Sequence, residues 1–291
     1  MNGILLIDKP EGWTSHDVVQ KMRRLYETKQ VGHTGTLDPM ATGLLPICIG
    51  RATKVAEYIS DDRKAYIATA SAGFRTDTGD TSGEVYARSP HPVPNDLESV
   101  LEAFRGEQLQ LPPMHSALKY KGKKLYEYAR KGICVPREKR PITVTKLECL
   151  SSDKESVTIL AEVSSGTYIR TLLDDIGVAA GCYLTMSALR RISVGSTSID
   201  DSFTIEEVEA MTSRERKDAL LPMDRLLEHM PAIHLPVSRL KPAMSGMSSR
   251  IQSSVPLADV YRVYAGDTFV GLGTLKEIDG AMNISMKKVL V

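Results

Sequence analysis

Short stretches in which hydrophobic residues alternate with polar ones, or follow one another without a break, predict strands in this chain. Residues 3–7 form an apolar run of the kind that lies buried in a sheet. Residues 64–73 alternate, which places Tyr66 at the head of a face of small alanines. Residues 142–150 and 156–164 are two strand-like runs that lie close together in the sequence and predict a hairpin.

Apolar residues three and four positions apart predict helices between these strands. Thr14 or Ser15 can cap the first helix, because both side chains can accept hydrogen bonds from the first turn. The apolar positions of that helix are Val18, Val19, Met22, Leu25 and Tyr26. Further helices are expected over residues 51–60, 95–104 and 204–211. Residues 166–177 pass from a strand end into a helix, with Arg170 at the junction.

The length of the chain predicts more than one domain. Its 291 residues suit one large domain and one small domain. From about Met230 onward, prolines punctuate short β-prone runs, and this change of texture predicts a small all-β module. We therefore expect a large domain over residues 1–230 and the module over residues 231–291.

Charge is unevenly distributed, although the net charge of the chain is only +1. Residues 115–146 carry ten Lys or Arg against two acids, whereas residues 199–230 carry nine acids against four bases. The near-neutral total therefore combines a basic surface with an acidic one, and the basic surface favours a nucleic-acid partner.

The four cysteines are far apart in the sequence and form no CxxC pair. This spacing argues against a zinc site and a disulfide framework, and it fits a reducing cytoplasm. The apolar run at the N-terminus is too short for a signal peptide or a membrane span. The nucleotide-binding patterns GxxxxGKS, GxxxxGKT and GxGxxG do not occur, so we expect no nucleotide cofactor. From the cysteine spacing and the short apolar run, we also expect no metal and no membrane.

Residues 32–46, GHTGTLDPMATGLLP, are neither an ordinary helix nor an ordinary strand. They hold three glycines, two prolines and three threonines, together with a single carboxylate, Asp38. Glycines allow backbone angles or close approaches that a Cβ forbids, and Pro39 biases Asp38 toward an extended backbone. Because apolar residues flank this stretch, it predicts a stiff, anchored loop that presents the carboxylate.

A second interpretation of the same residues is a helix start. Asp is a favoured N-cap, and Pro is favoured at the first helical position. His33 and the threonines would then be ordinary loop residues. On local sequence alone, this is the better interpretation.

Residues 112–132, PPMHSALKYKGKKLYEYARKG, interleave basic residues with tyrosines. Lysines and arginines meet phosphates, whereas tyrosines can stack on bases or pack. The segment can be an RNA-contacting surface or the solvated basic face of a helix, and composition slightly favours RNA contact. The lysines concerned are Lys119, Lys121, Lys123 and Lys124.

The stretch around Asp38 resembles, almost letter for letter, the catalytic motif of the TruB family of tRNA pseudouridine synthases. The resemblance extends to Lys9-Pro10, the strand with Tyr66, SALKYKGKKLYEYAR, GTYIRTLLDDIG and Leu189-Arg190-Arg191. The C-terminal part is similar to a shortened PUA-type RNA-binding module. The resemblance implies an α+β pseudouridine-synthase fold, in which helices flank a mixed, mostly antiparallel sheet and a PUA-like module follows.

The resemblance also implies a reaction, the isomerisation of uridine 55 in the T-loop of tRNA to pseudouridine. The glycosidic bond breaks, the uracil turns within the site, and its carbon-5 bonds to the ribose. The family does this without cofactor, metal or energy source, and one carboxylate suffices as the covalent or proton-transfer group. We expect a cytoplasmic, monomeric enzyme whose partner is the T-stem-loop of tRNA.

The catalytic roles that the resemblance implies fall on Asp38, Tyr66 and Arg170. Asp38 is the catalytic group, and Arg170 pairs with it, keeps it ionised and fixes its rotamer. Tyr66 stacks on the target base, and His33 fills the gap that this base leaves when it flips out. Lys9 supports the catalytic loop. The expected substrate-binding residues are His33, Lys9, Leu189, Tyr168, Lys119, Lys121, Lys123 and Lys124.

Two other classes of protein share some of these features. A carboxylate glycoside hydrolase needs two opposed carboxylates, and the motif offers one. A non-catalytic tRNA-binding or tRNA-folding protein would keep the basic segment and the module, but would not need Asp38, Tyr66 and Arg170 together. Whether the module is also needed for folding stays open in the sequence.

Overall fold

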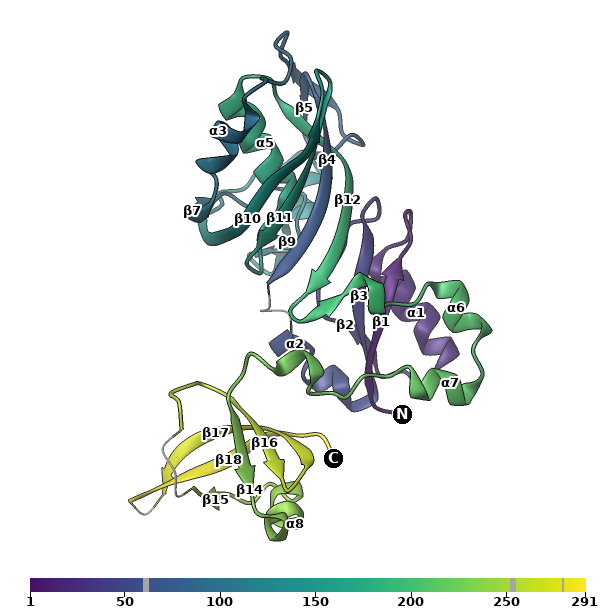
Figure 1. The fold of residues 1–291 in the computed structure, drawn as a ribbon, viewed down its shortest axis with the longest axis vertical. Helices are drawn as coiled ribbons and strands as arrows, with labels where there is room; N and C mark the ends of the chain where they lie inside the picture. The colour runs from purple at the N-terminus through teal and green to yellow at the C-terminus, as the bar shows by residue number, and fades with distance from the viewer. Residues whose placement is uncertain (60–62, 252–254, 279) are drawn as a thin grey trace.

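The structure is a computed structural model, and it describes residues 1–59, 63–251, 255–278 and 280–291. Within these residues, a large sheet forms the upper part of the molecule and a smaller sheet forms the lower part (Figure 1). Neighbouring strands are mostly antiparallel, and each sheet contains a parallel pair. The predicted α+β class and the mixed, mostly antiparallel sheet are confirmed.

Nine strands of the described residues form the large sheet. In spatial order its main strands are β1 (Gly3–Lys9), β3 (Thr42–Ile49), β12 (Leu184–Val194), β4 (Lys64–Ala72), β11 (Ser156–Val163), β10 (Arg140–Ser152) and β7 (Gly106–Gln110). In addition, β2 (Val31–His33) pairs with β3, and β13 (Thr197–Ser198) pairs with β12. The late strand β12 therefore lies between two early ones, parallel to β3 and antiparallel to β4.

One face of the large sheet shares a core with the helices. These are α1 (Ser15–Leu25), α3 (Leu97–Glu102), α5 (Ile169–Ala180) and α6 (Ile205–Ala210). Tyr66, Ala68 and Ala70 of β4 face this core, which confirms the alternation predicted for that strand. Thr14 caps α1 in a reciprocal arrangement with Asp17, in which each side chain accepts a hydrogen bond from the other's backbone N–H.

Asp38 does not begin a helix, and in this respect the second interpretation of its sequence is wrong. Its carbonyl accepts a turn hydrogen bond of 3.0 Å from the N–H of Ala41. Because β3 starts at Thr42 and pairs with β1 along its length, too few residues remain for a helix.

One other expectation differs from the structure. The helix expected over residues 51–60 is a 3-10 turn, Gly50–Lys54, followed by the short α2 (Ala56–Ile59); Ser60 lies outside the described residues. Residues 77–84 form the connection of a hairpin between β5 (Phe74–Thr76) and β6 (Val85–Arg88), as suits a polar, glycine-rich stretch. Asp80 orders its tip, because its carboxylate accepts hydrogen bonds from the hydroxyls of Thr78 and Ser82.

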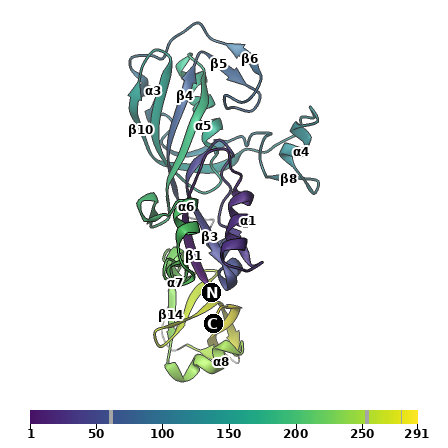
Figure 2. The same cartoon turned by 90° about the vertical axis from the view of Figure 1, so that its right-hand side faces the viewer.

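Residues 118–131, here called the basic arm, project from the body of the molecule (Figure 2). The arm consists of β8 (Lys119–Tyr120), β9 (Lys123–Lys124) and α4 (Leu125–Ala129). Lys121 and Gly122 join the strands with φ angles of 47° and 83°, the left-handed conformations that a tight hairpin turn needs. The rings of Tyr120 and Tyr128 pack edge to face at 6.0 Å, so tyrosines stabilise the arm itself.

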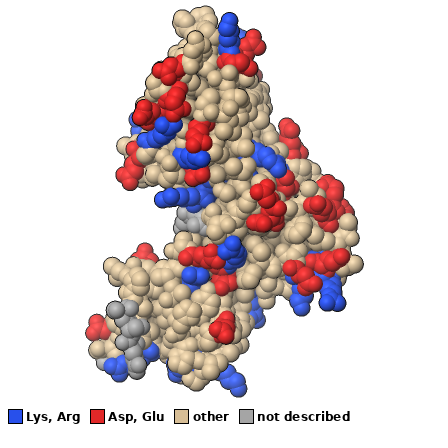
Figure 3. Space-filling model, in the orientation of Figure 1, with Lys and Arg blue, Asp and Glu red and all other residues tan. Residues whose placement is uncertain are grey.

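Acidic side chains gather over another part of the molecule, around α6 and α7 (Ser213–Asp218), on the face shown in Figure 3. They belong to Glu206, Glu207, Glu209, Glu215 and Asp218. The acidic and basic segments of the sequence thus lie on different parts of the surface. No helix of the described residues is long and apolar enough to cross a membrane.

The smaller sheet begins at Ala232, within the segment where we expect a small all-β module. Within the described residues it has five strands, in the order β14 (Ala232–Leu235), β16 (Tyr261–Ala265), β17 (Thr268–Ile278), β18 (Ala281–Val289) and β15 (Ser249–Arg250). The short α8 (Leu240–Met244) contributes to a core of its own with Ile233, Tyr261 and Val263.

The module also shares a core with the large sheet. Leu272 and Leu290 of the module lie in one buried cluster with Leu44 and Cys48 of β3. The next residue along β3, Leu45, points the other way, into the core beneath the helices. β3 is therefore buried on both faces, and the module covers the back of the strand that follows the Asp38 loop.

Removal of residues 231–291 is therefore expected to destabilise the remaining chain. Each apolar side chain fully buried in this cluster contributes roughly 1.5–3 kcal/mol, and truncation exposes several. For a chain of this size we expect Tm to fall by roughly 5 °C or more, measured by thermal melting of chain 1–230. In the full chain, Leu272→Ala should lower Tm, whereas Leu257→Ala, at a fully exposed position, should not. An unchanged Tm after truncation would show that the interface contributes nothing.

Candidate active site

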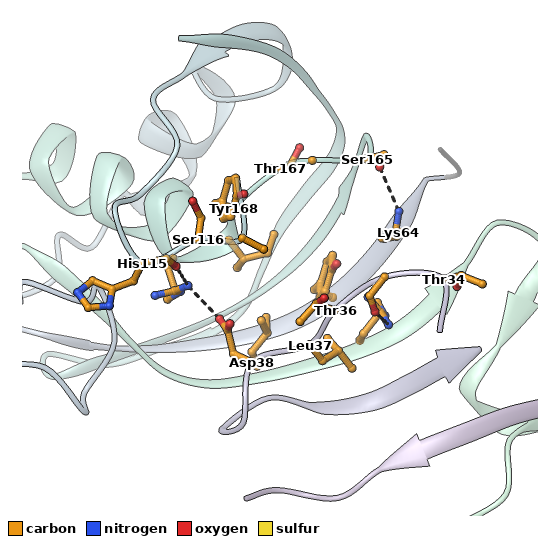
Figure 4. A pocket seen from close by; sticks show the side chains of 18 residues that line it. Thr34, Thr36, Leu37, Asp38, Lys64, His115, Ser116, Ser165, Thr167 and Tyr168 are labelled. Atoms are coloured by element: carbon orange, nitrogen blue, oxygen red, sulfur yellow. Dashed lines mark hydrogen bonds and ion pairs between the residues drawn. The ribbon is translucent and has the colours of Figure 1, made fainter. Parts of the chain in front are cut away.

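A pocket of about 250 Å³ lies beside Asp38, where the loop before β3 meets β4, β12 and the start of α5 (Figure 4). Its lining side chains include Asp38, Tyr66, Tyr168, Arg170, Leu189 and Arg191. Five of these residues were predicted from sequence, and they come from widely separated parts of the chain. The fold therefore brings them to one place.

A buried lysine supports the Asp38 loop. Lys9 is fully buried at the end of β1, and its ammonium donates to the carbonyls of Pro10, Trp13 and Pro39 at 2.9, 2.7 and 3.3 Å. Pro39 directly follows Asp38, so this contact fixes the backbone next to the carboxylate. The expected contact of Lys9 with substrate is corrected here, because an enclosed ammonium with three carbonyl partners supports the loop and does not reach RNA.

The stability of the protein should report this buried ammonium. Burial lowers the pKa of Lys9 to about 8 from the usual 10.5; Asp38, Glu11 and Asp17 oppose the shift, and Arg191 adds to it. Because the unfolded chain binds this proton more tightly, Lys9 stabilises the fold most above pH 10.5, and that gain is lost as pH falls through about 8. We expect the Tm difference between the parent and Lys9→Met to widen between about pH 7 and pH 9.5. A constant difference would contradict the shift.

Arg191 anchors the other side of the loop. It is 1% exposed, and its guanidinium donates to the carbonyls of Leu44 at 2.7 Å and Gly35 at 3.2 Å. Gly43 has a φ of 103°, and a Cβ there would lie 2.3 Å from the carbonyl oxygen of Arg191. The backbone conformation and close packing at position 43 thus require glycine, whereas a Cβ at Gly32 or Gly35 would make only ordinary van der Waals contacts.

Arg170 links the Asp38 loop to the turn at Thr78 and Asp80 and to the segment at His115. Its side chain is 8% exposed, and its guanidinium lies 3.1 Å from Oδ2 of Asp38 and 3.6 Å from Oδ2 of Asp80. It also donates to the carbonyls of Thr78 at 2.7 Å and His115 at 2.8 Å. The Asp38 side chain remains 40% exposed toward the pocket. A fixed cation therefore orients a carboxylate that is open to a ligand.

Sequence reasoning missed Asp80, which is 6% exposed and lies next to Arg170. Its signal was a carboxylate among threonines, serine and glycines, the same kind of composition as the Asp38 loop. Because Asp80 is held by the hydroxyls of Thr78 and Ser82, it is a fixed second partner for the guanidinium.

The opposite wall of the pocket is flat and largely apolar. Tyr66 and Leu189, each 8% exposed, come from the neighbouring strands β4 and β12, in which Leu189 pairs with Ala68. Tyr168 also lines the pocket, and burial raises the pKa of its hydroxyl. Ser116, 5% exposed, lowers that pKa through its nearby hydroxyl, yet its Oγ has no partner in hydrogen-bonding geometry. Such a pocket suits a flat ring with a polar edge.

The remaining predicted residues lie outside this pocket. His33 ends β2, just before the loop, and burial lowers the pKa of its ring. Lys119, Lys121, Lys123 and Lys124 are exposed on the basic arm. Among the described residues, no group of three His, Cys, Asp or Glu side chains could hold a metal ion.

Solved structures share this fold along nearly the whole chain. The crystal structure of the archaeal box H/ACA sRNP Nop10-Cbf5 complex matches with a TM-score of 0.75 at 24% identity, covering 99% of this chain and 86% of the other. A Cbf5-Nop10-Gar1 complex matches with a TM-score of 0.74 at 25% identity, covering 99% and 85%. The molecule therefore shares its fold with both of these structures over nearly its whole length.

Sequence comparison then identifies the protein family. The pattern of the TruB family pseudouridylate synthase N-terminal domain matches residues 23–169, and that of the tRNA pseudouridylate synthase B C-terminal domain matches residues 170–228. tRNA pseudouridine synthase B of Citrobacter koseri is 41% identical over 304 residues, covering 100% of this chain and 96% of that protein. The Chromobacterium violaceum protein of the same name is 45% identical over 276 residues, covering 94% and 90%. The chain belongs to the TruB family of tRNA pseudouridine synthases, as the motif predicted.

Proposed function

We propose that this enzyme converts uridine 55 in the T-loop of tRNA to pseudouridine, with Asp38 acting on a nucleotide that has flipped into the pocket. The observation that carries the proposal is the pair of Asp38 and Arg170. The arginine is buried and held by two backbone carbonyls, whereas the carboxylate that it orients is open to the pocket.

The pair suits the chemistry of a glycosidic isomerisation. Arg170 orients the Asp38 carboxylate, and a carboxylate can attack the ribose or remove a proton from it. The bond between the ribose and N1 of uracil breaks, the base turns, and C5 bonds to the same ribose carbon; C5 loses a proton and N1 gains one. Atoms and electrons balance within the nucleoside, so the reaction consumes no oxidant, reductant or second substrate.

The size of the pocket supports the entry of a single base. The volume of about 250 Å³ has room for several water-sized groups, and uracil is a single ring of few atoms. A base inside its stacked loop cannot reach this space, so the nucleotide flips out. Tyr66 then lies along the ring and Leu189 beside it, and His33 at the rim of the loop fills the vacated position in the RNA.

Site-resolved conversion of a tRNA transcript tests this proposal. The purified enzyme is incubated with an unmodified transcript, and pseudouridine is mapped by chemical labelling and primer extension. We expect conversion at position 55 and none in a transcript that carries cytidine there. Binding without conversion would favour the alternative, a non-catalytic tRNA-binding or tRNA-folding protein, and conversion confined to other positions would refute the site.

The basic arm is expected to contribute most of the salt dependence of binding. Each phosphate contact adds a slope of about −0.7 to −0.9 in log K against log salt, and these lysines are exposed. Changing Lys121, Lys123 and Lys124 to Glu should flatten the slope measured by tRNA titration at several salt concentrations. Lys217→Glu, on the acidic part of the surface, is the control. An unchanged slope in the triple variant would place the phosphate contacts elsewhere.

A further inference from the structure

We propose that Gln110 is a positioning residue for the isomerisation, because its side chain seats the turn that carries Tyr168 and Arg170. The inference rests on the proposed function, since Arg170 is the group proposed to orient Asp38. Gln110 does not itself line the pocket, and the reaction mechanism above does not use it.

The amide of Gln110 pairs with the backbone of Tyr168 at both of its ends. Gln110 is the last residue of β7 and is 4% exposed. The N–H of Tyr168 donates to Oε1 at 2.8 Å, and Nε2 donates to the carbonyl of Tyr168 at 3.0 Å. A side chain thus makes the two hydrogen bonds that a strand would make, with a residue 58 positions away in the sequence.

These two hydrogen bonds act where α5 begins. Tyr168 is the residue that precedes the helix, and its own side chain does not cap the helix start. Arg170 lies two residues further on and donates to the carbonyl of His115. Gln110 and His115 belong to the same short segment before the basic arm, so this segment and the turn are joined at two points.

Loss of the Gln110–Tyr168 hydrogen bonds should therefore displace Arg170, which contacts His115. Without the Gln110 hydrogen bonds the backbone at Tyr168 can shift, and a shift of the Arg170 guanidinium changes the orientation of Asp38. The apolar residues of α5 remain buried in the main core, so the helix itself stays in place. The effect should fall on the chemical step, and binding of tRNA outside the pocket should change little.

β7 also provides a matched control. Gln108 lies two residues earlier on the same face of the strand, and its Nε2 donates to the carbonyl of Phe104. It does not contact Tyr168 or line the pocket. Gln108→Ala therefore removes a comparable hydrogen bond from the same strand without touching the turn.

The test compares Gln110→Glu, Gln110→Ala and Gln108→Ala in the full-length enzyme. Gln110→Glu keeps the size of the side chain and the acceptor for the Tyr168 N–H, but places an oxygen against the Tyr168 carbonyl. We expect both Gln110 variants to lower the single-turnover rate about 10-fold or more, with tRNA Kd within about 3-fold of the parent. Gln108→Ala should keep the parent rate even if its Tm falls as much as that of the Gln110 variants.

Two results would overturn the role of Gln110. One is a Gln110→Glu rate within about 2-fold of the parent, and the other is an equal loss of rate in Gln108→Ala at matched Tm. If Gln110→Ala does not fold, the isosteric Gln110→Glu decides. The parent is assayed first on the T-loop transcript, because an inactive parent refutes the proposed function, whereas an active parent with unaffected variants refutes only this inference.

Discussion

Asp38→Asn should bind tRNA and form no pseudouridine. Asparagine has the shape of aspartate, and the turn hydrogen bond of this residue is made by its backbone carbonyl, so the loop should keep its conformation. A neutral amide can neither attack the ribose nor accept a proton from it. We expect the single-turnover rate to fall at least about 10⁴-fold, with tRNA Kd within a few-fold of the parent.

A suitable control for Asp38→Asn is Asp174→Asn. Asp174 also pairs with an arginine, Arg75, through hydrogen bonds of 2.7 and 2.6 Å, and it lies outside the pocket. The control should retain the parent rate. Conversion by Asp38→Asn at anything near that rate would remove Asp38 from the mechanism.

The second large effect is expected for Arg170→Lys, although the charge is kept. A lysine offers one compact ammonium, whereas the guanidinium serves two carboxylates and two carbonyls at once. We expect a loss of about 10²-fold in the single-turnover rate, larger than the loss in tRNA affinity, because the orientation of Asp38 depends on the planar fork. Tm should also fall, because a lysine cannot keep all the contacts of Arg170 with the Thr78 and His115 carbonyls and with Asp80.

Arg75→Lys is the matched control for this change. Arg75 forms a two-point pair with Asp174, and neither residue lines the pocket. Its replacement should lower stability without slowing the reaction. Single-turnover rates of Arg170→Lys within a few-fold of the parent would show that charge alone suffices at this position.

The elements that the sequence predicted best are those with a clear period or an unusual composition. The alternation around Tyr66 and the helical spacing after Thr14 gave the correct elements. The stiff loop around Asp38 was anticipated from its glycines and prolines, although only Gly43 proves to need its special backbone. These signals are local, so one sequence suffices to detect them.

What the sequence could not show depends on contacts between distant segments. Asp80 is important because Arg170 reaches it, and Gln110 because it meets Tyr168. The resemblance implied that Lys9 supports the Asp38 loop, but only the structure shows the three carbonyls that its ammonium contacts. The packing of the module was hinted at by the unbroken apolar run in β3, which is typical of a strand buried on both faces.

The position of β12 also bears on how this protein is made. β3 and β4 leave the ribosome early, but the strand that lies between them, and Arg191 with it, comes much later. At about 5–20 residues per second, the roughly 120 residues from the end of β4 to the end of β12 take about 6–24 s to synthesise. During that time the Asp38 loop has Lys9 but lacks Arg191, and the edges of β3 and β4 that face β12 are unpaired.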